Sequence, residues 1–209
     1  MTSVRALDPR APLVAVPPRV DAPDQSRVDL AAATSAASAF LDALGVDLEG
    51  EDRAETPRRM ATAYAEMLEP RPFTMTTFAN DEGYDELVLA RSVPVQSLCE
   101  HHMLPFVGVA HVGYLPGERI LGLSKLARVV ELFARRPQVQ ERLTVQVANW
   151  LQAQLSPRGV GVVVEAEHLC MTLRGVQAPG TTTITSALQG VLREDPRSRA
   201  EFLSLTGRP

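Results

Sequence analysis

The sequence predicts an α+β fold in which N-terminal helices precede an antiparallel sheet with two helices packed on one face. Two observations support this fold. Beyond residue 28, apolar residues recur at helical spacing through the first part of the chain. The rest of the chain then presents strand, strand, helix, helix, strand and strand patterns. This order argues against a doubly wound parallel sheet, in which strands and helices alternate.

Composition limits the class of protein. The chain has 209 residues, of which 45% are hydrophobic and 22% are charged, and this balance excludes wholesale disorder, collagen and a membrane bundle. At ~150 residues per domain, the length corresponds to about 1.4 domains, which means one domain with an appended piece or two small ones. The net charge of −4 disfavours binding to long nucleic acid, but it is compatible with a compact basic pocket for a phosphorylated small molecule.

We expect a cytoplasmic protein that binds no membrane. The first 28 residues carry charges and prolines but no apolar core long enough for export, and no run approaches the ~20 apolar residues of a membrane helix. The two cysteines, Cys99 and Cys170, are too few for a secreted disulfide scaffold. Reduced thiols in the cytoplasm are either inert core residues or metal ligands.

Three regions are expected along the chain. Residues 1–26 are rich in Pro and Ala without an apolar period, which predicts a flexible tail. Residues 27–84 form a helical region: the first helix stops at Gly45, and the second begins at Thr56, the expected cap, which a proline follows. Residues 85–209 carry the mixed α+β pattern.

The last region contains four expected strands and two expected helices. Pro94 places the first strand at an edge or at a bulge, and Ser124 is the expected cap of the first helix. The strands span 87–95, 106–115, 160–173 and 181–186, and the helices run from Ser124 to Pro137 and from Val139 to Pro157.

The run Cys99-Glu100-His101-His102 is the sharpest local feature. A Cys-x-x-His spacing lets one tight turn present a sulfur and an imidazole to the same ion. On the expected strand 160–173, side chains two apart project to one face, and a row of ligand and charged side chains there suits the wall of a site better than a core layer. These side chains are His168, Cys170, Thr172 and Arg174.

Spacing alone leaves two interpretations open. Either the cysteines are separate buried thiols and the histidines are structural, or two Cys and one His bind a zinc ion. Three protein ligands are typical of a catalytic site with water in the fourth position, whereas a fourth protein ligand normally closes a structural site. A second histidine can supply that ligand, so the count favours catalysis without proving it. His111, which alternates with valines, is expected to be structural.

Four segments are specific enough to carry a family resemblance. They are ETPRR (55–59), SLCEHHMLPFVGVAHVGYLPGERILGLSKLARVVELFARRPQVQERLTVQVA (97–148), GVGVVVEAEHLCMTLRGVQ (159–177) and GVLREDPRSRAEFL (190–203). In this order they resemble the GTP cyclohydrolase I family over roughly residues 28–206, so that the Pro-rich tail alone lies outside the resemblance.

The resemblance implies a fold, an activity and an assembly. It implies a tunnelling fold, with residues 85–209 as the catalytic domain, assembled into a ring: a homodecamer of two stacked pentamers with sites between subunits. It implies a hydrolase with one Zn²⁺ per subunit and no other cofactor. GTP and water would become 7,8-dihydroneopterin triphosphate and formate, the first step of tetrahydrofolate and pterin biosynthesis. Allosteric regulation is left open.

The resemblance also implies roles for individual residues. The zinc ligands are Cys99, His102 and Cys170, and the proton-transfer histidines are His101 and His168. Glu141 recognises the guanine edge, with Gln140 beside it as a second substrate-binding residue. The residues that hold the triphosphate are Ser124, Lys125, Arg128 and Arg174, with Arg59 reaching in from the helical region.

These residue types suit the chemistry. Opening a purine ring starts with hydration of C8, a poor electrophile, and zinc lowers the pKa of its water to about 7 so that hydroxide is available. Histidines that titrate near neutrality carry protons to and from the ring nitrogens. A carboxylate such as that of Glu141 accepts from the N1–H and amine of guanine, a pattern that adenine lacks. Cations and the helix start at Ser124 suit a triphosphate.

Three arginines are left out of the predicted triphosphate-binding residues, and two positions differ from the family pattern. Arg58 is expected on the surface, and the Arg135–Arg136 pair is expected to be solvated or to complement a helix dipole, so they are left out. Ala178 and Thr62 stand where many family members carry a basic residue, which implies weaker triphosphate binding or the use of other arginines.

Two other functions are open at this level. One is a non-catalytic, zinc-stabilised binding protein on the same fold, whose metal site His101 or His168 would close. The other is a tunnel-fold enzyme that acts on a different heterocycle. Glu141 and the phosphate set with Arg174 argue against the latter, because a substrate without a triphosphate would leave those cations unused.

Overall fold

The computed structural model describes residues 28–207. The flexible tail expected for residues 1–26 lies outside this range, and the division at residues 84 and 85 stays a prediction. None of the helices within the described range is long and apolar enough to cross a membrane.

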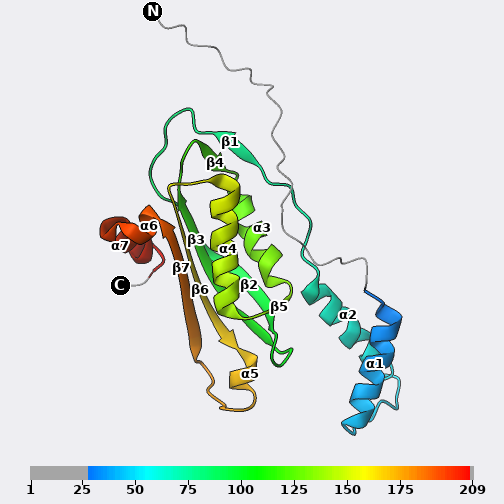
Figure 1. The fold of residues 1–209 in the computed structure, drawn as a ribbon. Helices are drawn as coiled ribbons and strands as arrows, with labels where there is room; N and C mark the ends of the chain where they lie inside the picture. The colour runs from blue at the N-terminus through cyan, green and yellow to red at the C-terminus, as the bar shows by residue number, and fades with distance from the viewer. Residues whose placement is uncertain (1–27, 208–209) are drawn as a thin grey trace, which may run out of the picture.

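A pair of helices opens the described chain and projects to one side of the sheet, which the second helix contacts (Figure 1). Helix α1 spans Leu30–Ala43, and helix α2 spans Thr56–Leu68. Gly45 follows α1 with a φ of +74°, a left-handed conformation that suits glycine, and its N–H donates to Asp42 O at 2.8 Å. The expected cap at Thr56 is wrong, because Glu55 holds the cap position and makes no side-chain capping bond.

The central sheet is five-stranded with the order β5-β2-β3-β6-β7. All its pairings are antiparallel except that between β2 and β5, which is parallel. A separate two-stranded sheet joins β1 and β4. The strands are β1 Thr77–Ala79, β2 Val88–Cys99, β3 Pro105–Leu115, β4 Arg119–Leu121, β5 Pro137–Gln138, β6 Gly159–His168 and β7 Thr182–Gly190.

The prediction for Pro94 is confirmed. Strand β2 is bulged between Ala90 and Val93, and Ser92 there has a φ of +54°. At Pro94 the strand pairs with β3, whereas its pairing with β5 begins only at Leu98. The missing N–H of proline therefore falls where β2 needs no second partner.

Two helices cover one face of the sheet, as expected (Figure 1). They are α3 Ser124–Ala134 and α4 Gln140–Leu155. Their fully buried leucines, Leu126, Leu143 and Leu151, belong to the main core together with Phe106 and Val162 of the sheet. Ser124 begins α3 but does not cap it: Leu123 holds the cap position, without a side-chain bond.

The C-terminal helices, α6 Val191–Glu194 and α7 Pro196–Leu205, cover part of the opposite face. Phe202 of α7 is fully buried and clusters with Val163, which alternates with the core residue Val162 on β6. Its ring lies over Gly161, where an added Cβ would come within 2.7 Å of Phe202. Glycine is therefore required at this position by the close approach of the ring.

The long strand expected for 160–173 is wrong beyond His168. Strand β6 ends there, and α5 Leu169–Thr172 is a single helical turn. Leu169, Met171 and Leu173 alternate with polar residues, a pattern that is typical of a strand. In the structure, however, Leu173 is 68% exposed, and its N–H donates to Leu169 O at 3.1 Å, as in a helical turn. Consequently His168, Cys170, Thr172 and Arg174 do not share a strand face.

Replacing Gly161 by Ala should lower the free energy of unfolding by roughly 1–3 kcal/mol, because the new methyl group displaces the Phe202 ring from a well-packed cluster. Urea unfolding followed by tryptophan fluorescence measures this. Gly122→Ala is the control, since its Cβ would meet its nearest neighbour at an ordinary 3.5 Å. Equal stability of both variants would contradict the packing of Phe202 on Gly161.

Candidate metal centre and active site

A tight turn between β2 and β3 brings Cys99 and His102 together. The N–H of Met103 donates to Cys99 O at 2.8 Å, and the N–H of Cys99 donates to Leu104 O at 2.9 Å. Met103 has a φ of +53°, which reverses the chain within the turn. As a result, Cys99 Sγ lies 3.7 Å from His102 Nδ1. The Cys-x-x-His spacing therefore presents both ligands to one point, as predicted.

Cys170 completes a group of three possible metal ligands. The ligand atoms of Cys99, His102 and Cys170 all lie within 4.8 Å of one another, with both cysteines buried and the histidine exposed. Ligand atoms around a tetrahedral zinc ion are roughly 3.3–3.8 Å apart, as bond lengths of ~2.0–2.3 Å require. Two sulfurs and one imidazole nitrogen form a donor set that zinc favours. The residues therefore fit a zinc ion.

Burial and neighbouring groups shift the pKa of the Cys170 thiol. Burial raises the pKa of the Cys170 thiol, and its hydrogen bond to Cys99 and the charge of Cys99 raise it further, while the charge of Arg174 opposes this. Arg174 itself is exposed, just beyond α5. Burial and the neighbouring Cys99 are thus the main reasons that the pKa of this thiol is raised.

His101 lies next to the metal-binding group but outside it. Its side chain is 65% exposed, its Nδ1 lies 3.8 Å from Cys99 Sγ, and its Nε2 lies 4.0 Å from Glu100 Oε1. Its ring meets that of His102 edge-on, with centroids 6.3 Å apart. An exposed imidazole at the rim of the metal group can exchange protons with solvent or with a bound molecule.

Glu100 connects the turn to helix α4 through an ion pair. Both oxygens of its carboxylate accept from Arg142, at 2.7 and 2.8 Å. The hydrogen bond from Arg142 is the main reason that the pKa of Glu100 lies below its ordinary value. Because Arg142 stands two residues after Gln140, this bidentate pair ties the metal-binding turn to the start of α4.

His168 ends β6 and is held on two sides. Its ring stacks on Phe106, with centroids 4.6 Å apart and planes 12° from parallel, and its Nε2 lies 2.7 Å from Gln140 Oε1. Burial lowers the pKa of His168, which the charge of Glu141 partly opposes. The side chain is therefore fixed in place and favoured in its neutral form.

One cavity of about 250 Å³ collects the predicted metal, proton-transfer and guanine-binding residues. Its predicted members come from three places along the chain: the turn after β2, the start of α4, and the end of β6 with α5. They are Cys99, His101, His102, Gln140, Glu141, His168 and Cys170. His111 is not among its lining residues; it is buried within β3, and its Nδ1 accepts from Ser92 N–H at 3.4 Å.

None of the predicted phosphate residues is among the lining residues of this cavity. Ser124 and Arg128 line a separate cavity of about 360 Å³ between α3 and β2. Lys125 is half-buried at the start of α3, and Arg59 is exposed on α2. Among the described residues, a single chain therefore brings the guanine and metal residues together in a cavity that the predicted phosphate residues, Arg174 included, do not line.

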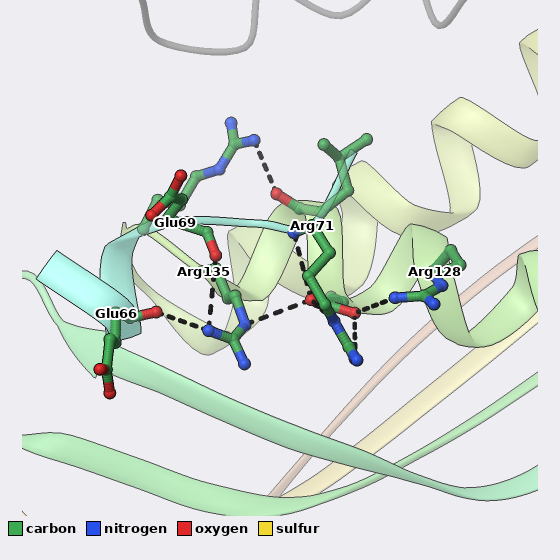
Figure 2. Close-up of polar contacts among 8 residues, drawn as sticks. Glu66, Glu69, Arg71, Arg128 and Arg135 are labelled. Atoms are coloured by element: carbon green, nitrogen blue, oxygen red, sulfur yellow. Dashed lines mark hydrogen bonds and ion pairs between the residues drawn. The ribbon is translucent and has the colours of Figure 1, made fainter. Parts of the chain in front are cut away.

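Three arginines surround Glu131 in the wall of that second cavity. Arg71 donates to both Glu131 oxygens at 2.7 Å, Arg128 donates at 3.2 Å, and Arg135 lies 3.4 Å away. Arg135 also donates to the backbone oxygens of Glu66 and Glu69 (Figure 2). The expectation that Arg135 is solvated or merely complements a helix dipole is therefore wrong.

Sequence reasoning missed Arg71 and Glu131. Burial by itself would raise the pKa of Glu131, but the hydrogen bonds and charge of Arg71, together with the charge of Arg135, outweigh it and lower the pKa below 4.5. Three guanidiniums around one carboxylate leave an excess of positive charge at this cavity. Arg71 belongs to an Arg-Pro-Phe segment after α2. No local sequence pattern in this segment predicts its contact with Glu131 of α3, which lies 60 residues further along the chain.

Glu131→Gln should lower the thermal unfolding midpoint at pH 7 by several degrees, because the arginines lose their anionic partner. The lowered pKa means that the carboxylate stabilises the fold above its unfolded-state pKa, near 4.5, and loses this effect as the pH falls through the folded-state pKa. The difference from wild type should therefore shrink below pH 4.5. A difference that is the same at pH 7 and in acid would contradict the ionic cluster; Glu66→Gln, on an exposed side chain, is the control.

The fold and the cavity define an α+β protein with a Cys-His-Cys ligand group at one end of its central sheet. The family model described as GTP cyclohydrolase I matches residues 33–207. GTP cyclohydrolase 1 of Mycobacteroides abscessus is 54% identical over 184 residues, 85% of this chain and 89% of that protein. GTP cyclohydrolase 1 of Aquifex aeolicus is 52% identical over 166 residues, 79% of this chain and 90% of that protein. The chain therefore belongs to the GTP cyclohydrolase I family and is an enzyme of that family.

Proposed function

We propose that this chain is a zinc-dependent enzyme that converts GTP and water to 7,8-dihydroneopterin triphosphate and formate, the first step of tetrahydrofolate and pterin biosynthesis. The observation that carries the proposal is the convergence of Cys99, His102 and Cys170 in one cavity with His168 and Glu141. Family membership supports the substrate. A cytoplasmic location and allosteric regulation stay predictions.

Cys99, His102 and Cys170 would hold one Zn²⁺ per subunit. Zinc with three protein ligands supplies Lewis acidity and makes water acidic enough to yield hydroxide near neutral pH, as addition to C8 of guanine requires. His168 lies outside the group of possible ligand atoms, which supports an open site rather than a closed, purely structural one. The exposed side chain of His101 stays outside the ligand group.

His101 and His168 would transfer protons at the purine ring and in the later rearrangement of the ribose. His168 is held neutral by burial, which suits a group that accepts a proton, and His101 is open to solvent, which suits release and uptake of protons. Glu141 is exposed in the first turn of α4 and lines the cavity, where its carboxylate can accept from the N1–H and amine of guanine.

The triphosphate would be bound by residues of more than one subunit. Ser124, Lys125, Arg128, Arg59 and Arg174 are all absent from the lining of the cavity that holds the metal ligands, although Arg174 lies just beyond α5. A tunnelling-fold ring, in a decamer of two pentamers, would bring Ser124 and Arg128 of one chain to the metal group of the next. Strand β7, at one end of the sheet order, has one long edge available for such an assembly.

Cys99→Ser and Cys170→Ser should each lose zinc and formate release, because the hard hydroxyl replaces a soft thiolate ligand. Elemental analysis measures zinc per chain, and fluorescence of oxidised neopterin measures turnover of GTP. Thr172→Ser, in the same helical turn as Cys170, should keep both. A zinc-replete and active double cysteine variant would contradict the ligand assignment.

Arg174→Ala should weaken binding of GTP by about tenfold or more while leaving guanosine binding nearly unchanged, because charge-assisted bonds to phosphate are worth ~1.5–3 kcal/mol. Isothermal calorimetry with both ligands measures the difference. Arg58→Ala is the matched control, since Arg58 is exposed and paired with Glu55. Equal losses for GTP and guanosine would show that Arg174 does not contact phosphate.

A further inference from the structure

We infer that Gln140 is a positioning residue that fixes the Nε2–H tautomer of His168, so that Nδ1 is the nitrogen that accepts a proton during the reaction. This inference rests on the proposed function, in which His168 transfers protons. It replaces the predicted contact of Gln140 with substrate. The partners of each polar atom of the Gln140 amide determine this tautomer.

Gln140 is buried and surrounded by hydrogen-bond acceptors. It is the first residue of α4 and only 1% exposed. Its Nε2 lies 3.1 Å from Val164 O, 3.0 Å from Thr183 O and 3.2 Å from Thr185 Oγ1. The first two partners are backbone carbonyl oxygens, which only accept. The two amide hydrogens are therefore shared among the acceptors on this side.

The hydroxyl of Thr185 also acts as an acceptor here. Thr144 Oγ1 donates its one hydrogen to the backbone oxygen of Gln140 at 2.8 Å. The 2.6 Å contact between Thr144 Oγ1 and Thr185 Oγ1 must then use the hydrogen of Thr185. Thr185 is left with lone pairs towards Gln140, so all three partners of Nε2 accept.

This arrangement determines which way the Gln140 amide points. Rotating it by half a turn would place Oε1 against two carbonyl oxygens and leave no donor between them, an arrangement that costs free energy in a buried site. The amide oxygen therefore faces His168, and it can only accept. The 2.7 Å contact between Oε1 and His168 Nε2 requires a hydrogen on Nε2.

A neutral imidazole carries one N–H, so a hydrogen on Nε2 leaves the lone pair on Nδ1. Stacking on Phe106 and the bond to Gln140 together fix both the plane and the rotation of the ring. Both polar atoms of the Gln140 side chain are engaged within the protein, whereas Glu141 is exposed at the cavity. The two consecutive residues thus have different roles: Gln140 orients His168, and Glu141 binds the substrate.

The tautomer can be measured directly in the wild-type, zinc-loaded protein. Magic-angle-spinning ¹⁵N NMR of histidine-labelled protein distinguishes protonated from unprotonated ring nitrogens, and a His168→Ala sample identifies the signals of His168. We expect hydrogen on Nε2 and a bare Nδ1 in the neutral ring. Hydrogen on Nδ1 overturns the inference, whether or not the protein turns over GTP.

Kinetics of Gln140→Met supply the second test. The thioether side chain keeps the length but removes the acceptor, so we expect kcat to fall about 10²-fold, as when a catalytic histidine loses its tautomer, while KM for GTP changes less than twofold. A raised KM with unchanged kcat would instead show substrate contact. Unchanged values of both would also overturn the inference.

Two controls separate the possible failures. Gln152→Met, on the same helix, removes a glutamine that donates to Pro157 O at 3.2 Å and should keep wild-type kinetics. If wild-type protein releases no formate from GTP, the proposed function fails, and the NMR result still decides the tautomer. If Gln140→Met does not fold, the wild-type spectrum alone decides the inference.

Discussion

The register of three strands is the constraint on which the site depends. Strands β2 and β3 pair Leu98 with Pro105, and strands β3 and β6 pair Phe106 with His168. The ends of β2 and β6 therefore meet at the same end of the sheet, about 70 residues apart in the chain. A slip of one residue in either pairing would turn the side chains to the opposite face and separate the metal ligands.

Much of the fold follows from local pattern, because its elements are amphipathic and long enough to be distinctive. Helices α3 and α4 and strands β2, β3, β6 and β7 appear in the predicted order, whereas the two-residue strand β5 between the helices is not predicted. The Cys-x-x-His turn also brings its sulfur and imidazole together, as its spacing predicts. The predicted strand position of Cys170 is wrong, however. Cys170 reaches the group from a helical turn, and three alternating apolar residues do not distinguish a strand from the start of a helix.

The remaining features depend on contacts between distant residues, which no local pattern encodes. Arg71 reaches Glu131 across 60 residues, and Gln140 meets Thr183 and Thr185 across more than 40. A buried glutamine looks like a substrate ligand in the sequence because it precedes Glu141. Both polar atoms of its amide are bonded within the protein, and these contacts support the proposal that Gln140 orients His168.

The central claim is a zinc ion held by two thiolates and one imidazole, and zinc K-edge X-ray absorption of the purified protein tests it most directly. The account predicts a four-coordinate zinc with two sulfur ligands at about 2.3 Å, one imidazole nitrogen near 2.0 Å and one further light atom. A zinc shell without sulfur, or with two imidazoles beside the two sulfurs in the resting protein, would contradict it.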